Sequence, residues 1–322
     1  MKVAFDVSPL AQTGAGTARV VLGLSRALER RPGLEILPVG FDGHGRGATV
    51  VRDLMWYPFG IAHEARSADV LHCTTMRGPV RTQRPVVVTV HDCALLRHPE
   101  AFPLWHRHTG RMALRHGVKS ADAIVAVSAF TRDELVELLD VSAEQIRVIP
   151  NGLEPVFTEA GPKTPGEYVL AVGTLEPRKN LARAVEAAAR AGAELRVVGA
   201  QGWGGVEVPG WAGRVDDEEL AMLYRGARCL VFPSLYEGFG LPVLEAMACG
   251  TPVVTSRGGA TEEMAGGAAV LVDPLDADAI AAGIAEAEAR RDELRQLGLA
   301  HAQDFSWSHS ADLVEALWRE LA

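Results

Sequence analysis

The sequence lacks long hydrophobic runs and an excess of positive charge. No apolar stretch approaches the roughly 18 residues needed to cross a bilayer, and the chain opens on the strand-like KVAFDV rather than on a basic stretch leading into an apolar one. We therefore expect a cytoplasmic protein without a membrane-spanning helix. The formal net charge of −9 argues against general nucleic-acid binding, so no nucleic-acid partner is predicted.

Metal-binding patterns are also missing. The cysteines stand far apart, with no C-x-x-C pair and no histidine at zinc-ligand spacing, which predicts reduced thiols in the core at Cys73, Cys93, Cys229 and Cys249. The only D-x-D sequence, Asp276-Ala277-Asp278, follows Pro274 at a predicted helix start, where its expected role is capping. We therefore predict neither a metal nor another cofactor.

Two common nucleotide-binding fingerprints are absent. Gly14-Ala15-Gly16 follows a predicted strand and opens a helix, where small residues let backbone amides approach an anion. The dinucleotide fingerprint needs a further glycine where Arg19 stands, and no G-x-x-x-x-G-K-[ST] sequence occurs. An NAD or FAD enzyme and a P-loop hydrolase are therefore set aside. The glycine loop can also be a plain strand-to-helix turn.

Short apolar runs alternate with helical patterns along the whole chain, and its 322 residues suffice for two domains. Strands are expected at 3–7, 70–73, 86–90, 123–127, 147–150, 168–172, 195–199, 229–232, 252–255 and 269–272. The alternation predicts an α/β fold with two doubly wound parallel sheets. A stretch rich in proline and glycine at 150–166 is typical of an interdomain linker. Ligands of such sheets bind beyond the carboxyl ends of the strands, so we expect the site in the cleft between the domains.

The most distinctive motif runs from Tyr236 to Glu245. Glu237 precedes Gly238-Phe239-Gly240-Leu241-Pro242, which leads into a predicted helix at 241–248 that contains Glu245. Glycines before a helix and a proline in its first turn leave backbone amides and the helix dipole available to an anion. A carboxylate beside an anion site is explained if it accepts hydrogen bonds from sugar hydroxyls. The alternative is two solvated glutamates.

A pair of cations follows the strand predicted at 168–172. Arg178 and Lys179 stand just before a helix that Asn180 can cap. A guanidinium can hold two phosphate oxygens while an ammonium adds a point charge, which suits a diphosphate leaving group. An exposed surface pair is the alternative.

The first half of the chain contains a candidate catalytic histidine and more basic than acidic residues. His91 and Asp92 follow the strand at 86–90, where a histidine can be catalytic or simply structural, and Asp92 could orient it. Residues 1–155 contain 18 Lys and Arg against 16 Asp and Glu, and the cations of the helix predicted at 104–119 recur every four residues. This segment could contact a membrane surface or an anionic acceptor, or be a solvated face.

Taken together, these segments resemble the retaining family 4 glycosyltransferases. The resemblance rests on E-G-F-G-L-P-V-L-E at 237–245, G-T-L-E-P-R-K-N at 173–180 and T-V-H-D at 89–92, in the order of that family. It implies a GT-B fold, with an acceptor-side domain at 1–155, a nucleotide-sugar-binding domain at 156–305, and a final helix at 306–322 that crosses back to the first domain. Many relatives read Gly-x-Gly-Arg-Tyr in the first loop, whereas this chain has Gly14-Ala15-Gly16-Thr17-Ala18.

The resemblance also implies roles for single residues. Arg178 and Lys179 are expected to bind the donor diphosphate, Glu245 the ribose, and Glu237 with the backbone of Gly238, Phe239, Gly240 and Leu241 the transferred sugar. His91 is expected near the reacting centre. The Gly14 to Gly16 loop is expected to close over the donor, and Arg214-Val215 to meet the base.

The resulting hypothesis is a hexosyltransferase that uses a nucleoside diphosphate sugar, with GDP-mannose favoured over UDP sugars, and a hydroxyl acceptor on a glycan, glycolipid or small molecule. Transfer is expected to need no metal. The alternatives are a UDP-sugar epimerase on the same fold and a sugar-nucleotide-binding regulator without activity.

Overall fold

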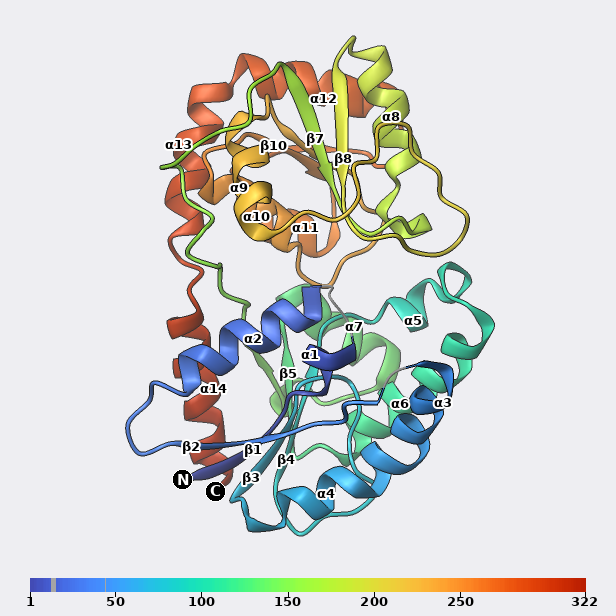
Figure 1. The fold of residues 1–322 in the computed structure, drawn as a ribbon, viewed down its shortest axis with the longest axis vertical. Coiled ribbons are helices and arrows are strands. Elements are labelled where there is room, and N and C mark those ends of the chain that lie inside the picture. Colours follow the sequence, from blue (N-terminus) through green and yellow to red (C-terminus); the bar gives the residue numbers. More distant parts are fainter. Residues whose placement is uncertain (13–15, 44) are drawn as a thin grey trace. The chain divides into compact units, whose positions relative to one another are not determined.

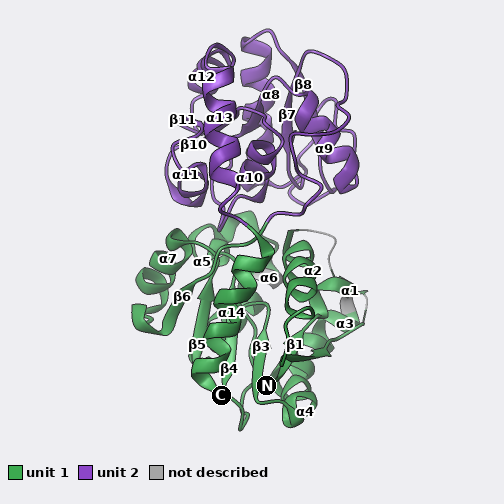
Figure 2. Cartoon of the chain, turned by 90° about the vertical axis from the view of Figure 1, so that its left-hand side faces the viewer, with its two compact units in different colours: residues 1–152, 306–322 green, residues 153–305 purple. Residues whose placement is uncertain are grey.

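The chain folds into two compact units (Figure 2). In the computed structural model, which describes residues 1–12, 16–43 and 45–322, unit 1 comprises Met1–Gly152 and Ser306–Ala322, and unit 2 comprises Leu153–Phe305. The chain therefore leaves unit 1 after Gly152 and returns to it at Ser306. The sequence pattern places the first of these points at residue 155.

Unit 1 is built on a parallel sheet in the order β2-β1-β3-β4-β5-β6. Its strands are β1 (Lys2–Asp6), β2 (Glu35–Val39), β3 (Val70–Cys73), β4 (Val86–Val90), β5 (Ala123–Ala126) and β6 (Ile146–Val148). Strands covered by helices on both faces consist of continuous apolar residues, and the central strand β4, VVVTV, is buried along its whole length.

Successive strand residues of unit 1 contribute to two different cores. Val3 and Phe5 pack with α2 (Gly16–Leu28) and α14 (Trp307–Leu321), whereas Ala4 belongs to the core on the other face. The other face is covered by the helices of the 45–139 region (Figure 1). These are α3 (Gly45–Val51), the π-helix η1 (Arg52–Gly60), α4 (Ile61–Glu64), η2 (Ala65–Ser67), α5 (Ala94–Arg97), η3 (Pro99–Ala101), α6 (Leu104–Ser120) and α7 (Ala129–Leu139). The short helices α1 (Ser8–Gln12) and η4 (Ala143–Gln145) complete unit 1.

One strand of unit 1, β2, was not predicted from the sequence. β2 contains Pro38, and a proline within an apolar run weakens the prediction of a strand. The structure accommodates Pro38 because β2 lies at the edge of the sheet, and an edge strand can do without one backbone donor.

Unit 2 has a second parallel sheet, in the order β11-β10-β9-β7-β8. Its strands are β7 (Tyr168–Val172), β8 (Glu194–Val198), β9 (Leu230–Phe232), β10 (Val253–Ser256) and β11 (Val270–Val272). Apolar residues of α8 (Leu181–Arg190) and α12 (Ala277–Ala289) share one core with these strands. The remaining helices of unit 2 are η5 (Pro177–Lys179), α9 (Asp217–Gly226), α10 (Leu241–Ala248), α11 (Gly259–Ala265) and α13 (Arg291–Ala302).

The segment after the predicted helix start at Asp276 forms two helices rather than one. α12 ends at Ala289 and α13 begins at Arg291. Ile280 of α12 packs on the sheet, whereas Gly298 of α13 lies against Met247 of α10. Leu294 of α13 remains in the core that Ile280 joins, and the break at Arg290 lets α13 also reach α10.

Two further predictions concern the cysteines and the cap of α12. The thiols are free and buried at Cys73, Cys93, Cys229 and Cys249, as predicted. Asp276 caps α12 by accepting from the backbone N–H groups of Asp278 and Ala279, which confirms the capping role. Within the described part of the chain, no helix is both long and apolar enough to cross a membrane.

Candidate active site

The site in unit 2 begins at the turn after β7. Asn180, between η5 and α8, has left-handed backbone angles (φ 56°). Its side-chain Nδ2 donates to the carbonyl oxygens of Pro233 (2.9 Å) and Pro274 (2.7 Å). Its Oδ1 accepts from Arg183 Nη1 at 2.9 Å and from no backbone N–H of α8, so the prediction that this side chain caps α8 is wrong. The amide instead fixes the turn to the segments that follow β9 and β11.

This turn holds Arg178 and Lys179 against Glu237. Lys179 Nζ donates to Glu237 Oε1 at 2.5 Å, and Arg178 Nη1 donates to Glu237 Oε2 at 3.1 Å and to the carbonyl of Tyr236 at 2.8 Å. Only 9% of the Glu237 side chain is exposed, against 15% and 13% for the two cations. The pair is therefore not an exposed surface pair.

A second carboxylate, Glu176, completes the cluster. Glu176 Oε1 lies 2.8 Å from Arg178 Nη2, and its side chain is 4% exposed. The sequence predicts Arg178 and Lys179 as phosphate-binding cations without indicating a counter-charge, whereas the structure pairs them with Glu176 and Glu237. A charge that loses most of its hydration needs a nearby counter-charge. A carboxylate two residues before a pair of cations was the signal that could have indicated this.

The electrostatics keep Glu237 ionised. Burial alone would raise the pKa of its carboxyl, but Lys179 and Arg178 beside it lower that pKa to about 2. At neutral pH Glu237 therefore accepts hydrogen bonds and cannot donate a proton.

The glycine-rich segment after Glu237 leads into α10. Gly240 precedes the helix with φ +107°, a conformation that a side chain rarely adopts, and Pro242 lies in the first turn. Within the described chain, no side chain caps this helix. Its first amides and its dipole are therefore directed towards the region of Glu237. Phe239 is buried and makes an edge contact with Phe305 at 6.2 Å between ring centroids.

Glu245 lies in the interior of unit 2. Its side chain belongs to a residue only 1% exposed, and Oε2 accepts a hydrogen bond from the hydroxyl of Tyr224 on α9 at 3.0 Å. Tyr224 was not singled out from the sequence. The two residues are 21 positions apart, so only the packing of α9 on α10 brings them together.

The predicted base-contacting segment follows the end of β8. Gly199 N–H donates to Gly213 O at 2.9 Å, which holds Arg214 and Val215 next to that strand end. A pocket of about 430 Å³ lies beside the 173–179 segment and is lined by Leu175, Gln201, Gly202, Trp203, Gly205, Val206, Glu207, Val208 and Trp211. Arg214 and Val215 are not among the lining residues.

In unit 1, His91 follows β4 and is partly buried. Burial lowers the pKa of its imidazole, so the neutral ring is favoured. Its Nε2 lies 2.9 Å from the carbonyl oxygen of Thr74, which can only accept, so Nε2 carries the proton and Nδ1 is an acceptor. Asp92 Oδ1 accepts from the backbone N–H of Ala94 at 3.0 Å, so it supports the start of α5.

Two glycines of unit 1, Gly14 and Gly16, were predicted to bind the donor. Gly16 is exposed and begins α2, whereas Gly14 lies outside the described residues.

Comparisons with known proteins assign the chain to a class. Residues 14–157 match the model of glycosyltransferase family 4, and residues 156–303 match that of glycosyl transferases group 1. The O-antigen chain mannosyltransferase B of Escherichia coli is 32% identical over 83% of this chain and 81% of its own length. A D-inositol 3-phosphate glycosyltransferase of Acidothermus cellulolyticus is 28% identical over 85% of this chain and 69% of its own. The serotype-specific mannosyltransferase WbdA of Escherichia coli matches over 28% of its length.

Solved structures share the whole fold. Sucrose-phosphate synthase from Thermosynechococcus elongatus aligns with a TM-score of 0.77 at 21% identity, covering 100% of this chain and 99% of that one. The Anabaena protein HepE, in complex with UDP and glucose, aligns with a TM-score of 0.76 at 17% identity over 100% of both chains. Two parallel-sheet units and these neighbours define the GT-B fold. The chain belongs to the family 4 glycosyltransferases.

Proposed function

We propose that this glycosyltransferase moves a hexose from a nucleoside diphosphate sugar to a hydroxyl acceptor with retention of anomeric configuration. The observation that supports it is the cluster of Arg178, Lys179 and Glu237 in front of α10. It combines cations for a diphosphate with an ionised carboxylate for sugar hydroxyls.

The chemistry depends on an exchange of partners. When the donor binds, its phosphate oxygens take N–H donors of Arg178 and Lys179, and sugar hydroxyls donate to the Glu237 carboxylate in their place. As the bond between the sugar and the phosphate breaks, negative charge grows on the diphosphate. The cations and the amides at the start of α10 then stabilise the leaving group, and this charge stabilisation is the main catalytic contribution.

Retention follows from attack on the same face of the sugar that the diphosphate leaves. The acceptor hydroxyl forms the new bond to the anomeric carbon, and the leaving phosphate takes its proton. His91 Nδ1 accepts a hydrogen bond from a hydroxyl of the sugar. NMR of the product, which distinguishes the two anomers, tests this: an inverted product would contradict it.

GDP-mannose is our preferred donor, with UDP sugars next. The names of the Escherichia coli relatives support mannose, whereas the HepE structures contain UDP and UDP-glucose. Thermal shift with GDP, UDP and their sugars decides between them, because a ligand at 100 times its Kd adds roughly 2.7 kcal/mol of stability. If no nucleotide raises the melting temperature, the proposed donor site is wrong.

Glu245 is proposed to bind the ribose of the donor. Because Glu245 also accepts from Tyr224, alanine would confuse binding with stability. Glu245→Gln keeps an acceptor oxygen for Tyr224 but weakens the bond to a ribose hydroxyl. We expect a higher KM for the donor with a similar kcat; a fall in kcat alone would exclude the ribose role. Arg214 and Val215 are proposed to meet the base through their backbone, so Arg214→Ala should leave KM unchanged.

Transfer is proposed to need no divalent metal. The only D-x-D pair is occupied: Asp276 caps α12, and Asp278 forms an ion pair with Arg190. The assay is transfer after exhaustive EDTA treatment, followed by addition of magnesium or manganese. Activity that disappears with chelation and returns with metal would overturn the proposal.

Peripheral membrane contact is proposed through α6. Arg111, Arg115 and Lys119 are exposed on this helix, and Met112 beside them is 72% exposed. Cations next to an exposed apolar side chain suit an anionic membrane surface. Sedimentation with vesicles that contain phosphatidylglycerol tests the contact, with Arg111→Glu and Arg115→Glu expected to release the protein.

A further inference from the structure

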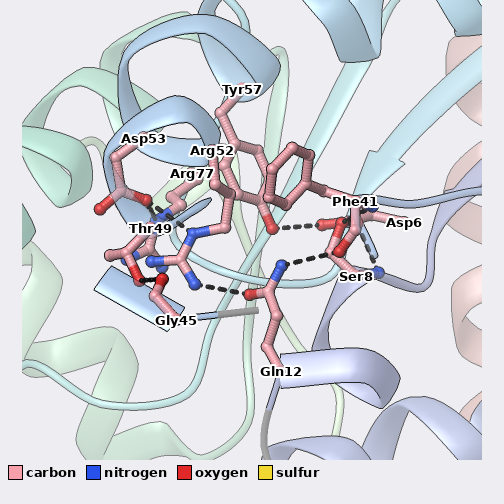
Figure 3. Close-up of polar contacts among 10 residues, drawn as sticks. All are labelled: Asp6, Ser8, Gln12, Phe41, Gly45, Thr49, Arg52, Asp53, Tyr57 and Arg77. Carbon is pink, nitrogen blue, oxygen red and sulfur yellow. Dashed lines mark hydrogen bonds and ion pairs between the residues drawn. The ribbon is translucent and has the colours of Figure 1, made fainter. Parts of the chain in front are cut away.

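A buried carboxylate ends the first strand of unit 1 (Figure 3). Asp6 Oδ1 accepts from the backbone N–H of Ser8 (2.9 Å) and from its hydroxyl (2.6 Å), and Oδ2 accepts from the hydroxyl of Tyr57 (3.0 Å). Both oxygens therefore already have donors. Asp6 is fully buried and Tyr57 is 2% exposed, so this contact fixes η1, which carries Tyr57, to the end of β1.

η1 also presents two charged residues, and a third approaches from the segment after β3. Arg52 Nε and Arg77 Nε both donate to the same oxygen of Asp53, Oδ1, at 2.8 and 3.1 Å. The exposed fractions of the three side chains are 14%, 17% and 11% for Arg52, Arg77 and Asp53. Two largely buried guanidinium groups thus share one oxygen of one carboxylate.

Most donors of these guanidinium groups are not used by Asp53. A guanidinium has five N–H groups in a fixed plane and can hold an oxyanion through two of them. Arg52 uses Nε for Asp53 and Nη1 for Gln12 Oε1 (2.6 Å). Arg77 lies 5.6 Å from the ring centroid of Tyr57, and within the described chain its terminal Nη atoms have no hydrogen-bond partner.

Arg52 and Arg77 lie at the carboxyl ends of the strands of unit 1, where His91 also lies. The hydroxyl of Thr74 donates to the backbone carbonyl of Asp6 at 2.7 Å, and the carbonyl of Thr74 accepts from His91 at 2.9 Å. Arg77 follows Thr74 by three residues. The region around it is basic as well: residues 44–120 contain eleven Lys and Arg against five Asp and Glu, a net +6 in a protein of net −9. An anion is therefore attracted to this part of unit 1.

We propose that Arg77 and Arg52 bind a phosphate group carried by the acceptor. The assignment of this phosphate to an acceptor rests on the proposed function, whereas the anion site stands on the geometry alone. A phosphate supplies several acceptor oxygens for the guanidinium N–H groups that Asp53 leaves unused, and it brings one negative charge as a diester or up to two as a monoester. A neutral sugar hydroxyl offers a weaker, uncharged acceptor to these N–H groups. The phosphate belongs either to a soluble sugar phosphate or to a lipid headgroup.

Calorimetric titration of the full-length protein with inorganic phosphate and with glucose 6-phosphate tests the site. GDP or UDP, whichever raises the melting temperature, is kept at saturation so that Arg178 and Lys179 are occupied. We expect Arg77→Ala and Arg52→Ala to weaken phosphate binding at least tenfold and Arg77→Lys to weaken it less. Arg81→Ala is the matched control, because Arg81 is an exposed arginine of the same segment, and it should bind like the wild type.

Vesicles separate the two sources of the phosphate. If a lipid headgroup is the ligand, Arg77→Ala lowers binding to phosphatidylglycerol vesicles relative to Arg81→Ala; if a soluble sugar phosphate is the ligand, the two variants bind the vesicles alike and differ only in the titration. Circular dichroism and the nucleotide thermal shift show whether each variant is folded. If Arg77→Ala does not fold, Arg77→Lys replaces it in the binding experiments.

Different results would contradict the anion site, its role in acceptor binding and the donor site of unit 2. Phosphate binding of equal strength in the wild type, Arg77→Ala and Arg52→Ala removes the site, as does the lack of binding to the wild type in every arm. A transfer assay in which neutral and phosphorylated acceptors react equally well, with Arg77→Ala unchanged, removes the acceptor role. Failure of the nucleotide thermal shift counts against the donor site of unit 2 only.

Discussion

The two units hold their arginines in opposite ways. In unit 2, Arg178 and Lys179 face two carboxylates, Glu176 and Glu237, so the charges of that cluster balance. In unit 1, Arg52 and Arg77 share one oxygen of Asp53.

The difference indicates what each cluster can bind. A balanced cluster can exchange its internal pairs for a ligand that brings both phosphate and hydroxyl groups, because each charge then finds a new partner. A cluster with surplus guanidinium donors suits a ligand that brings negative charge alone. Four predictions test this contrast, from the largest expected effect to the smallest.

Lys179→Ala should have the largest effect, on turnover. The ammonium stabilises the negative charge that grows on the diphosphate in the transition state. We therefore expect a lower kcat, equivalent to a rise of about 2 to 4 kcal/mol in the activation free energy. Steady-state kinetics with the correct donor measure it, and Lys163→Ala, at an exposed lysine of the same unit, is the control. An unchanged kcat would show that the balanced cluster does not contact the leaving group.

Acid should weaken unit 2 through Glu237. Its folded pKa of about 2 lies below the ordinary 4.5, so the stabilisation is present above pH 4.5 and is lost as the pH falls towards 2. Across that window, the difference in the free energy of unfolding between the wild type and Glu237→Gln should shrink by about 3 kcal/mol. Denaturant unfolding of both proteins from pH 6 to the lowest pH at which they stay folded measures it. A difference that does not change with pH would contradict the ion pairing.

Tyr57→Phe should destabilise unit 1 by roughly 2 kcal/mol, since a buried carboxylate loses one of its donors. The comparison variant is Tyr168→Phe in unit 2, whose hydroxyl donates to the neutral carbonyl of Leu223 at 2.8 Å and should cost about 1 kcal/mol. Urea unfolding measures both losses. Equal or reversed losses would show that Asp6 does not depend on Tyr57.

Asp276→Ala should have the smallest effect. It removes the cap of α12 and costs about 1 kcal/mol of stability, while turnover stays unchanged because the residue has no part in the proposed chemistry. Thermal unfolding and the transfer assay together measure this. A loss of activity that added metal restores would instead make the acidic pair a metal site and would undo the contrast with Arg178 and Lys179.

Much of the fold follows from local sequence signals. Runs such as VVVTV at 86–90 predict buried parallel strands, and the helix at 241–248 was predicted with the bounds that the structure has. The predicted capping by Asp276 was confirmed, because a cap is a contact between neighbours in the chain. The proline in β2 concealed that strand, since tolerance of a proline depends on whether the strand lies at an edge.

Only part of the candidate site could be predicted from the sequence. Motif and spacing indicated Arg178, Lys179 and Glu237, and the structure brings these three together. The role of Asn180 was predicted wrongly, because its real partners, Pro233 and Pro274, lie 53 and 94 residues away.

What the sequence determined by itself was therefore most of the strands, the main motifs and the identity of the charged residues. Only the tertiary structure decided how those charges are paired. Gln12, Arg52 and Arg77 come from different segments of unit 1, and no local pattern says that Arg52 and Arg77 meet at one oxygen of Asp53. The physical reason is that the charge balance of a buried group depends on which other charges lie within a few ångströms, and packing between distant segments sets those distances.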